Sequence, residues 1–181
     1  MDLSFLKPLP DYLIQRYNGW KATTFSNNKS WYHKLAEDGQ HPRAMIISCC
    51  DSRVHVTSIF GSDAGEFFIH RNIANLVPPF KKDQDYHGTS AAIEYAVKTL
   101  KIPHIIVLGH STCGGVKSCF DYFSGSTPDL YEDSNFVASW LEILRPSFEK
   151  ISQEPNISNK IRALEKQTVL TSLENLTTFP F

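Results

Sequence analysis

Two short stretches of the sequence contain side chains that commonly bind metal ions. One stretch holds Cys49, and the other holds His110 and Cys113 in a His-x-x-Cys arrangement. Together they would supply two thiolates and one imidazole, a ligand set that suits zinc. Three protein ligands leave a fourth position for water or substrate, which is typical of catalytic zinc sites. The sequence therefore predicts one zinc ion (Zn2+) per chain, in an open site.

The other two cysteines are expected to be structural. Cys119 follows Cys113 by six residues, which would place it well along a helix. It remains a candidate for a fourth ligand, which would close the site. Cys50 is next to Cys49 on a predicted strand, so its side chain should point to the opposite face. Because free cysteine is among the most buried residue types, we expect Cys50 and Cys119 in the core.

Asp51 and Arg53 follow Cys49 at intervals of two residues. If the chain stays extended there, the three side chains share one face. The carboxylate could then ligate zinc or accept a bidentate pair of hydrogen bonds from Arg53. An ordinary ion pair is the simpler interpretation. Beside a metal ion, the same carboxylate could switch between arginine and zinc.

Three apolar runs rich in β-branched residues predict buried parallel strands. They are residues 44–49, 66–70 and 103–109. Helices are expected at residues 11–17, 28–37, 89–100, 114–123, 137–148 and 157–176. Thr89 or Ser90 should cap the third helix, and Pro146 should break or kink the fifth.

Strands that alternate with helices predict an α/β fold with a mainly parallel β-sheet flanked by helices. Residues 1–40 predict an N-terminal helical arm in front of that sheet. In parallel sheets, ligands bind beyond the carboxyl ends of the strands. Cys49 ends the first predicted strand, and His110 and Cys113 directly follow the third. The fold therefore predicts that the three candidate ligands meet at one edge of the sheet.

The composition is that of a globular domain. The 181 residues include 18 Lys and Arg against 19 Asp and Glu, for a net charge of −1. This balance argues against a broad nucleic-acid or membrane surface, which would need a basic excess. No apolar run approaches the length of a membrane span, and no secretory signal pattern is present. We therefore expect one domain, residues 1–181, in the reducing cytoplasm.

Four motifs, taken in order, resemble those of the β-class carbonic anhydrases. They are residues 48–53, 70–75, 91–97 and 109–115. The resemblance implies that Cys49, His110 and Cys113 are the zinc ligands. It also implies that Asp51 and Arg53 form the catalytic dyad. The combination C-x-D-x-R with a later H-x-x-C on strand ends is highly specific.

The same resemblance assigns a substrate pocket. The positions that line it in the family are matched here by Gln40, Phe68, Ile73 and Tyr95. Gly114 matches the position whose backbone N–H faces the substrate. From the residues alone, core packing explains Phe68, Ile73 and Tyr95 equally well. A solvated loop explains Gln40.

The activity that the resemblance implies is the reversible hydration of carbon dioxide to bicarbonate and a proton. A relative with the same ligands could instead hydrolyse carbon disulfide or carbonyl sulfide, and a closed site would indicate a non-catalytic zinc-stabilised binding module. The resemblance also implies an intertwined homodimer, often doubled to a dimer of dimers. In that assembly the Gln40, Phe68 and Tyr95 positions come from the subunit that does not hold the zinc.

Two departures from the family pattern are informative. The bicarbonate-regulated branch has Trp and Gly where this chain has Ile46 and Ser48, so the chain resembles the other, plant-like branch. We therefore expect Asp51 to pair with Arg53 rather than with zinc. The family also usually continues beyond the position of Phe181 with strands that complete the sheet. Because this chain ends before them, we expect open sheet edges that a partner subunit covers.

Overall fold

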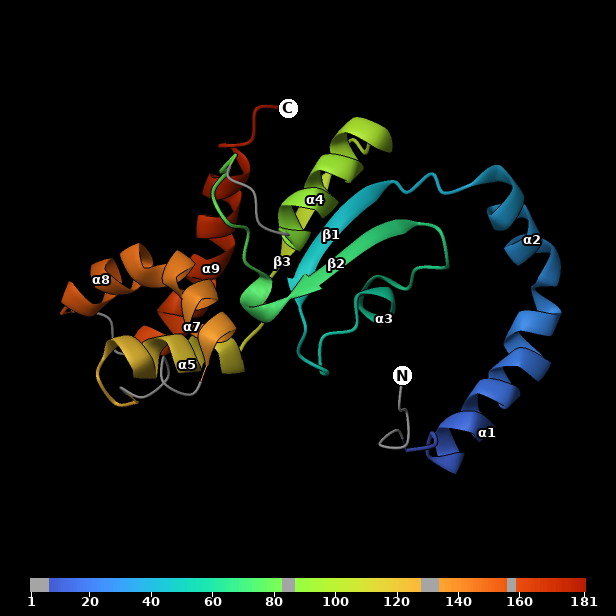
Figure 1. Ribbon diagram of the computed structural model, residues 1–181, viewed down its shortest axis with the longest axis horizontal. Helices are drawn as coiled ribbons and strands as arrows, with labels where there is room; N and C mark the ends of the chain where they lie inside the picture. Colours follow the sequence, from blue (N-terminus) through green and yellow to red (C-terminus); the bar gives the residue numbers. More distant parts are fainter. Residues whose placement is uncertain (1–6, 83–86, 128–133, 156–158) are drawn as a thin grey trace, which may run out of the picture. The chain divides into compact units, whose positions relative to one another are not determined.

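A computed structural model describes residues 7–82, 87–127, 134–155 and 159–181 of the chain (Figure 1). The contacts within the chain divide it into two units, Met1–Gln40 and His41–Phe181. The second unit contains the β-sheet and the predicted metal ligands, whereas the first is helical. None of the helices formed by the described residues has the length and apolar character that a bilayer-spanning segment needs.

The described residues of the second unit form a three-stranded sheet in the order β2-β1-β3. Its strands are β1 (Ala44–Cys49), β2 (Phe67–Asn72) and β3 (Ile105–Leu108). Both pairings are parallel, and Met45 of β1 lies opposite Phe68 of β2 and Ile105 of β3. The central strand β1 is buried along its whole length. The predicted parallel sheet flanked by helices is confirmed.

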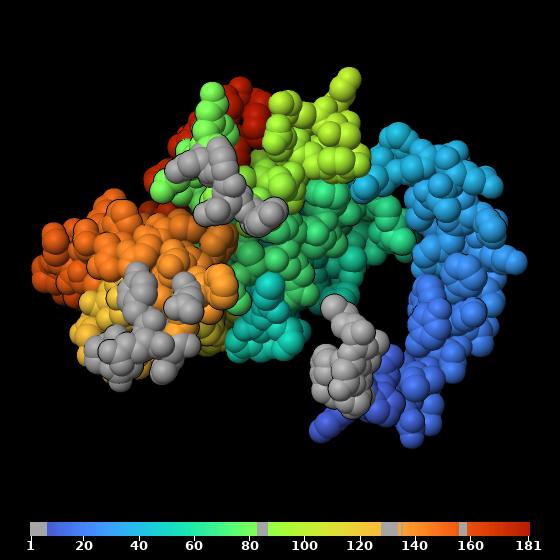
Figure 2. All heavy atoms as spheres, viewed as in Figure 1, coloured from blue at the N-terminus to red at the C-terminus, as the bar shows by residue number. Residues whose placement is uncertain are grey.

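Two buried clusters surround the sheet. One joins Met45 and Ile47 of β1 to α4 (Gly88–Glu94) and the π-helical turn η3 (Tyr95–Thr99). The other surrounds Cys49, at the carboxyl end of β1. It is built by α5 (Gly114–Phe123), α7 (Asn135–Leu141), α8 (Arg145–Gln153) and α9 (Lys160–Leu176). Figure 2 shows these helices, yellow to red, gathered beside the strands.

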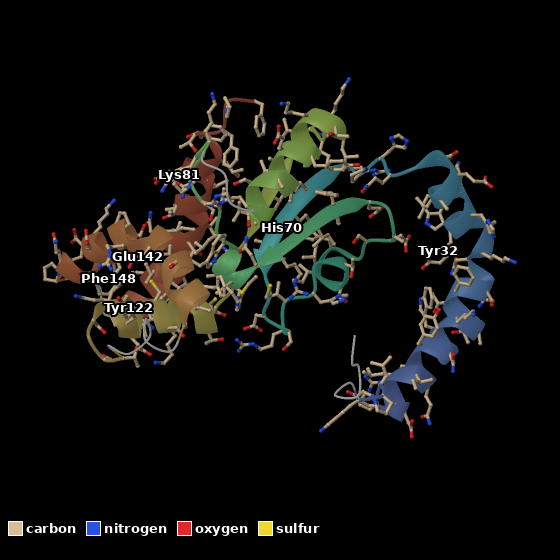
Figure 3. The ribbon with its side chains drawn as sticks, viewed as in Figure 1. Tyr32, His70, Lys81, Tyr122, Glu142 and Phe148 are labelled. Atoms are coloured by element: carbon tan, nitrogen blue, oxygen red, sulfur yellow. The ribbon has the colours of Figure 1, made fainter. Side chains whose placement is uncertain are left out.

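The helix expected to follow Thr89 begins one residue earlier, at Gly88. The prediction that Thr89 or Ser90 caps it is wrong, because Thr89 already lies in the first turn. Its hydroxyl is instead 2.9 Å from Nε2 of His70 on β2, which is labelled in Figure 3. Thr89 therefore ties α4 to the sheet rather than capping the helix.

The apolar pattern at residues 137–148 predicted a helix interrupted at Pro146. In the structure, α7 is followed by the 3-10 turn η4 (Glu142–Leu144), and α8 then begins with Pro146 in its first turn. Proline is tolerated there because a first-turn N–H has no partner within the helix. The predicted break is confirmed.

The last helix, α9, buries a different face from the one expected. The apolar stripe was expected to start at Ile157, which lies outside the described residues. Leu164 of that stripe is buried, but Leu173 is 42% exposed. The buried positions of α9 are otherwise polar: Glu165, Thr168, Thr171 and Ser172. Each has a hydrogen-bond partner in the interior, which explains why polar side chains face inward here: Glu165 bonds Cys113, Thr168 and Ser172 bond Asn75, and Thr171 bonds Ser147.

The first unit contains α1 (Asp11–Trp20), the π-helical turn η1 (Lys21–Phe25) and α2 (Lys29–Asp38). The rings of Trp20, Phe25 and Tyr32 pack on one another, with centroids 5.3 to 6.0 Å apart; Figure 3 labels Tyr32. In these described elements no side chain is buried. Further apolar side chains lie open to solvent: Tyr12, Leu13, Ile14, Tyr17 and Trp31. The predicted helical arm is present, and it has no core of its own.

Candidate metal centre

The predicted ligands come together where β1 and β3 end. Cys49 is the last residue of β1, while β3 leads into the loop that carries His110 and Cys113 and precedes α5. The donor atoms of the three residues all lie within 4.8 Å of one another. Both thiols are buried, with 4% of Cys49 and 2% of Cys113 exposed. Among the described residues, this is the one cluster with metal-ligand geometry.

The geometry of this cluster fits a tetrahedral zinc ion. With Zn–S bonds of about 2.3 Å, two sulfurs of such a site are about 3.8 Å apart. The Sγ atoms of Cys49 and Cys113 are 3.9 Å apart. Nδ1 of His110 lies 3.0 Å from the carbonyl oxygen of Ser111, so the ring donates its N–H there and keeps the Nε2 lone pair for a metal. Within the described residues the buried Nε2 has no hydrogen-bond partner, and a metal ion would supply one.

The sulfurs of Cys49 and Cys113 lie within hydrogen-bond distance, and a proton between them shifts the two pKa values in opposite directions. The pKa of Cys49 is lowered, chiefly because the Cys113 thiol hydrogen-bonds to its sulfur. The pKa of Cys113 is raised by the same hydrogen bond and by burial. Backbone N–H groups at the start of α5 also point at the Cys113 sulfur and favour its thiolate. A divalent cation between the two sulfurs would take the place of the shared proton and hold both as thiolates.

Asp51 and Arg53 form a doubly hydrogen-bonded ion pair beside the ligands. Arg53 Nε donates to Asp51 Oδ1 over 2.8 Å, and Nη2 donates to Oδ2 over 2.6 Å. The same guanidinium also donates to the hydroxyl and the carbonyl of Thr112, in the loop before Cys113. The Arg53 hydrogen bonds hold the pKa of the Asp51 carboxyl well below its usual range. A charged carboxylate therefore lies 4.0 Å from Nε2 of His110.

The backbone at this pair does not meet the condition for a shared face, which was an extended chain from Cys49 to Arg53. Instead the chain turns after β1: the N–H of Val54 donates to the Asp51 carbonyl over 2.9 Å, and the N–H of Arg53 donates to Asp51 Oδ1 over 3.0 Å. This side-chain-capped turn brings the guanidinium back onto the carboxylate.

Arg71, which the sequence reasoning missed, braces the same turn from β2. Its Nε donates to the carbonyl of Cys49 over 2.9 Å, and its Nη2 donates to the carbonyl of Asp51 over 2.7 Å. These two bonds fix the main chain between the first ligand and the carboxylate. Arg71 lies within one of the four family-like motifs, but no spacing rule distinguishes it from its neighbours.

Two of the predicted pocket residues lie near the ligands. Ile73 begins the 3-10 turn η2 (Ile73–Asn75) after β2, and its side chain is partly exposed. It packs so closely on α5 that a Cβ at Gly115 would lie 2.6 Å from its Cγ2. Glycine is therefore required at position 115. Gly114 is the first residue of α5, directly after Cys113.

The other predicted pocket residues lie elsewhere. The rings of Phe68 and Tyr95 pack on each other with centroids 5.9 Å apart. Phe68 lies opposite Met45, four residues before Cys49 on the neighbouring strand. That separation is about 13 Å along the strand direction. Gln40 is exposed and belongs to the N-terminal unit. Within one chain, the structure does not bring Phe68 and Tyr95 to the metal ligands.

The two remaining cysteines differ from each other. Cys119 is fully buried, and burial raises the pKa of its thiol to about 12. The prediction that it packs in the core is confirmed. The same prediction for Cys50 is wrong, because β1 ends one residue earlier and the Cys50 side chain is exposed. It lines a cavity of about 500 Å³ together with Ile73 and Trp140.

Comparisons with known proteins agree with this geometry. The model of one protein family, described as carbonic anhydrase, matches residues 44–181. The chain is 34% identical over 165 residues to Beta carbonic anhydrase 3 of Arabidopsis thaliana. That match covers 90% of this chain and 62% of the plant protein, so the chain spans less than two thirds of its relative's length.

Solved structures show the same fold. The structure of the β-carbonic anhydrase CcaA matches with a TM-score of 0.84 at 32% identity, over 94% of this chain and 74% of that one. A structure described among two tetrameric β-carbonic anhydrases of the ascomycete Sordaria macrospora matches with a TM-score of 0.72 at 29% identity, over 94% and 81% of the two chains. The chain therefore belongs to the β-class carbonic anhydrase family.

Proposed function

We propose that this protein is a zinc-dependent carbonic anhydrase that reversibly hydrates carbon dioxide to bicarbonate and a proton. The observation that carries the proposal is the convergence of Cys49, His110 and Cys113, with their sulfurs 3.9 Å apart and Nε2 of His110 without a hydrogen-bond partner among the described residues. Membership in the β-class family supports the same interpretation.

Cys49, His110 and Cys113 would hold one zinc ion per chain. Zinc in an open three-ligand site acidifies a bound water and so supplies a nucleophile near neutral pH. Asp51 would accept a hydrogen bond from that water and orient it, because its carboxylate is charged and lies 4.0 Å from Nε2 of His110. Arg53 keeps Asp51 in place through its two hydrogen bonds.

Carbon dioxide is apolar and bicarbonate is an anion, so the pocket needs apolar side chains for the substrate and hydrogen-bond donors for the product. Ile73 would offer an apolar wall, since it is partly exposed beside the start of α5. The N–H of Gly114, in the first turn of α5, has no partner within the helix and would bond a product oxygen. An N-terminal turn also favours a negative charge.

We infer that the complete pocket is shared between two subunits of a homodimer, which could double to a dimer of dimers. Phe68 lies about 13 Å along the strand direction from Cys49 of its own chain, and its ring packs on Tyr95, which is 45% exposed. This ring pair would therefore serve the site of a partner, together with Gln40. The apolar side chains of α1 and α2, none of which is buried within these helices, would be covered in such an assembly.

Three finer assignments belong to the same proposal. Residues 1–181 would act as one functional domain, with residues 1–40 as its arm. The carboxylate of Asp51 is bonded to Arg53, which supports the open, plant-like branch indicated by Ile46 and Ser48. The cysteines of the described residues are free thiols, which suits the reducing cytoplasm.

The test is a comparison of substrates on samples whose zinc content is known. Stopped-flow hydration of carbon dioxide should be fast, while hydrolysis of carbon disulfide and carbonyl sulfide should be negligible. The variant Cys49→Ser should abolish hydration, and Cys50→Ser, which alters the exposed neighbour, should preserve it. Fast hydrolysis of either sulfur compound without hydration would replace the proposed substrate. No turnover of any of the three in a zinc-loaded sample would favour a binding module.

A further inference from the structure

The buried face of α9 is polar where it meets the candidate metal centre. Glu165, Thr168 and Ser172 are each at most 5% exposed. Their spacing of three and four residues places them on one side of the helix. Burying a carboxylate is costly unless its oxygens are hydrogen-bonded. Glu165 is therefore the residue of this face whose surroundings most need an explanation.

Both carboxylate oxygens of Glu165 have a partner. Oε1 accepts a hydrogen bond from the backbone N–H of Cys113 over 3.1 Å. Oε2 accepts one from Nη1 of Arg162, one turn earlier on α9, over 2.8 Å. Cys113 immediately precedes α5, so its N–H is among the groups that the helix itself leaves without a partner. Glu165 supplies that partner from a helix 52 residues further along the chain.

The main chain at Cys113 needs such an anchor. Thr112, the residue before it, has φ +54°, in the left-handed region that a β-branched residue rarely adopts. Strained residues of this kind persist only where the surroundings hold them. The Glu165 bond lies on one side of this peptide, and the Arg53 bonds to Thr112 lie on the other.

The same face of α9 also holds the turn that follows β2. Nδ2 of Asn75 donates to the Thr168 hydroxyl over 3.2 Å, and the Ser172 hydroxyl donates to the Asn75 carbonyl over 2.9 Å. Asn75 and its neighbour Ala74 both have positive φ, at +49° and +61°. One helix face thus fixes two strained segments that flank the thiol ligands.

We propose that Glu165 is a positioning residue for the metal centre: its carboxylate holds the main chain of Cys113 so that the thiolate meets zinc already oriented. The inference rests on the proposed zinc site. Groups that orient a metal ligand typically contribute about 10- to 100-fold to metal affinity. Because the contact is made by an oxygen at a fixed reach, side-chain length should matter more than charge.

The length and the charge of the side chain can be changed separately. Glu165→Ala removes the bond, and Glu165→Asp keeps the charge but shortens the reach by one methylene. Glu165→Gln keeps the reach and an accepting oxygen without the charge, while the half-exposed Arg162 can turn to solvent. Thr171→Ala is the matched control. Thr171 lies on α9, like Glu165, but its buried hydroxyl pairs with Ser147 of α8 and not with Cys113.

The primary measurement is zinc affinity, determined by competition with a chromophoric chelator. We expect about 10- to 100-fold weaker binding for Glu165→Ala and about 10-fold weaker binding for Glu165→Asp. Glu165→Gln and Thr171→Ala should remain close to the wild type. In cobalt-substituted protein, the thiolate-to-cobalt charge-transfer band should change for the Ala and Asp variants only.

If Glu165→Asp binds zinc as tightly as the wild type and shows the wild-type cobalt spectrum, the inference is overturned, even if Glu165→Ala does not fold. A Glu165→Gln variant as weak as Glu165→Ala would also overturn it, because charge and not position would then be the cause. Failure of the proposed function has a different signature. A wild-type protein and a Thr171→Ala control that bind no zinc would remove the metal site itself, and the inference with it.

Discussion

At its carboxyl end, β1 places Cys49 beside Cys113 and next to hydrogen-bonded charged groups of Asp51, Arg53 and Arg71. At its amino end, Met45 pairs with Phe68, whose ring packs on Tyr95, a side chain 45% exposed. The first end is braced by Arg71 and Arg53, whereas the second leaves the Tyr95 ring partly open to solvent. A strand of six residues thus separates the candidate metal centre from a partly exposed pair of aromatic rings.

The two ends of β1 have different physical requirements. A metal centre needs donor atoms fixed within a few tenths of an ångström, so the chain surrounds it with its own hydrogen bonds. An apolar pocket wall needs only a complementary shape and the exclusion of water, and a second subunit can supply both. We therefore assign zinc chemistry to one end of β1 and the completion of a partner's pocket to the other.

The strongest loss is expected at the metal end. Cys113→Ser replaces one of three ligands by a neutral hydroxyl, which should cost roughly a third of the about 10–16 kcal/mol that structural zinc sites gain. We expect loss of most zinc and of most hydration activity. Metal analysis and stopped-flow assay of the same sample would measure both, with Cys50→Ser as the control. Full zinc occupancy in Cys113→Ser would remove this residue from the site.

The next largest effect tests whether the two ends of β1, taken from different subunits, form one site. Cys49→Ser and Tyr95→Ala should each be inactive as a homodimer. A mixed dimer carries one site with both lesions and one with neither, so up to about half of the wild-type activity should return. Co-expression with two affinity tags isolates the mixed dimers. If they are as inactive as either parent, zinc and Tyr95 of each site come from one chain, and the shared pocket is wrong.

A substitution at Asp51 tests the chemistry at the carboxyl end of β1 without removing a predicted zinc ligand. Asp51→Asn should keep zinc but lower the hydration rate by about 10²- to 10³-fold, the usual loss when one hydrogen-bonding group aimed at the reacting atoms is removed. Zinc analysis and stopped-flow rates measure the two effects separately. A crystal structure of the zinc-loaded wild type near neutral pH should show Asp51 on Arg53. An Asp51 oxygen about 2.0–2.2 Å from zinc would contradict its role of orienting the bound water.

A smaller effect concerns the pH dependence of the rate. Two thiolates neutralise the charge of zinc, so its bound water should be less acidic than the value of about 7 found with three histidines. The hydration rate should therefore rise through neutral pH into the alkaline range. Rates measured by stopped flow from about pH 6 to about pH 9 test this. A flat profile would show that another ionisation, or none, controls the rate.

The weakest effect lies between the two ends, at His70. Burial lowers the pKa of its imidazole, which bonds Thr89. The unfolded chain therefore binds a proton that the folded chain does not, once the pH falls below about 6.5. The burial of His70 therefore lowers the free energy of unfolding when the pH falls below about 6.5, and it has no such effect at higher pH. Thermal unfolding at acidic and neutral pH should show a smaller acid loss for His70→Gln than for the wild type. An equal loss would contradict this assignment.

The sheet and the convergence of the three candidate ligands could be predicted from the sequence, because both leave short-range patterns. The apolar run of β1 matches the strand residue for residue, and the His-x-x-Cys spacing identifies the loop after β3. Both depend on neighbours in the chain, which periodicity and motif spacing detect directly.

The supports of the site could not be predicted in the same way. Glu165 bonds a residue 52 positions away, and a polar residue on a helix is ordinarily expected to face solvent. Cys50 was expected inside because alternation was continued past the end of β1. The turn at Asp51 depends on its carboxylate accepting a hydrogen bond from the backbone N–H of Arg53, which an extended-chain argument ignores.

The dependence of hydration on zinc is the most direct test of the proposed function. Metal-depleted protein would receive zinc in steps, and bound zinc and stopped-flow hydration of carbon dioxide would be measured on the same samples. We expect the rate to rise in proportion to bound zinc and to level off at one zinc per chain. Full zinc binding without hydration, or hydration that does not depend on zinc, would contradict the proposal.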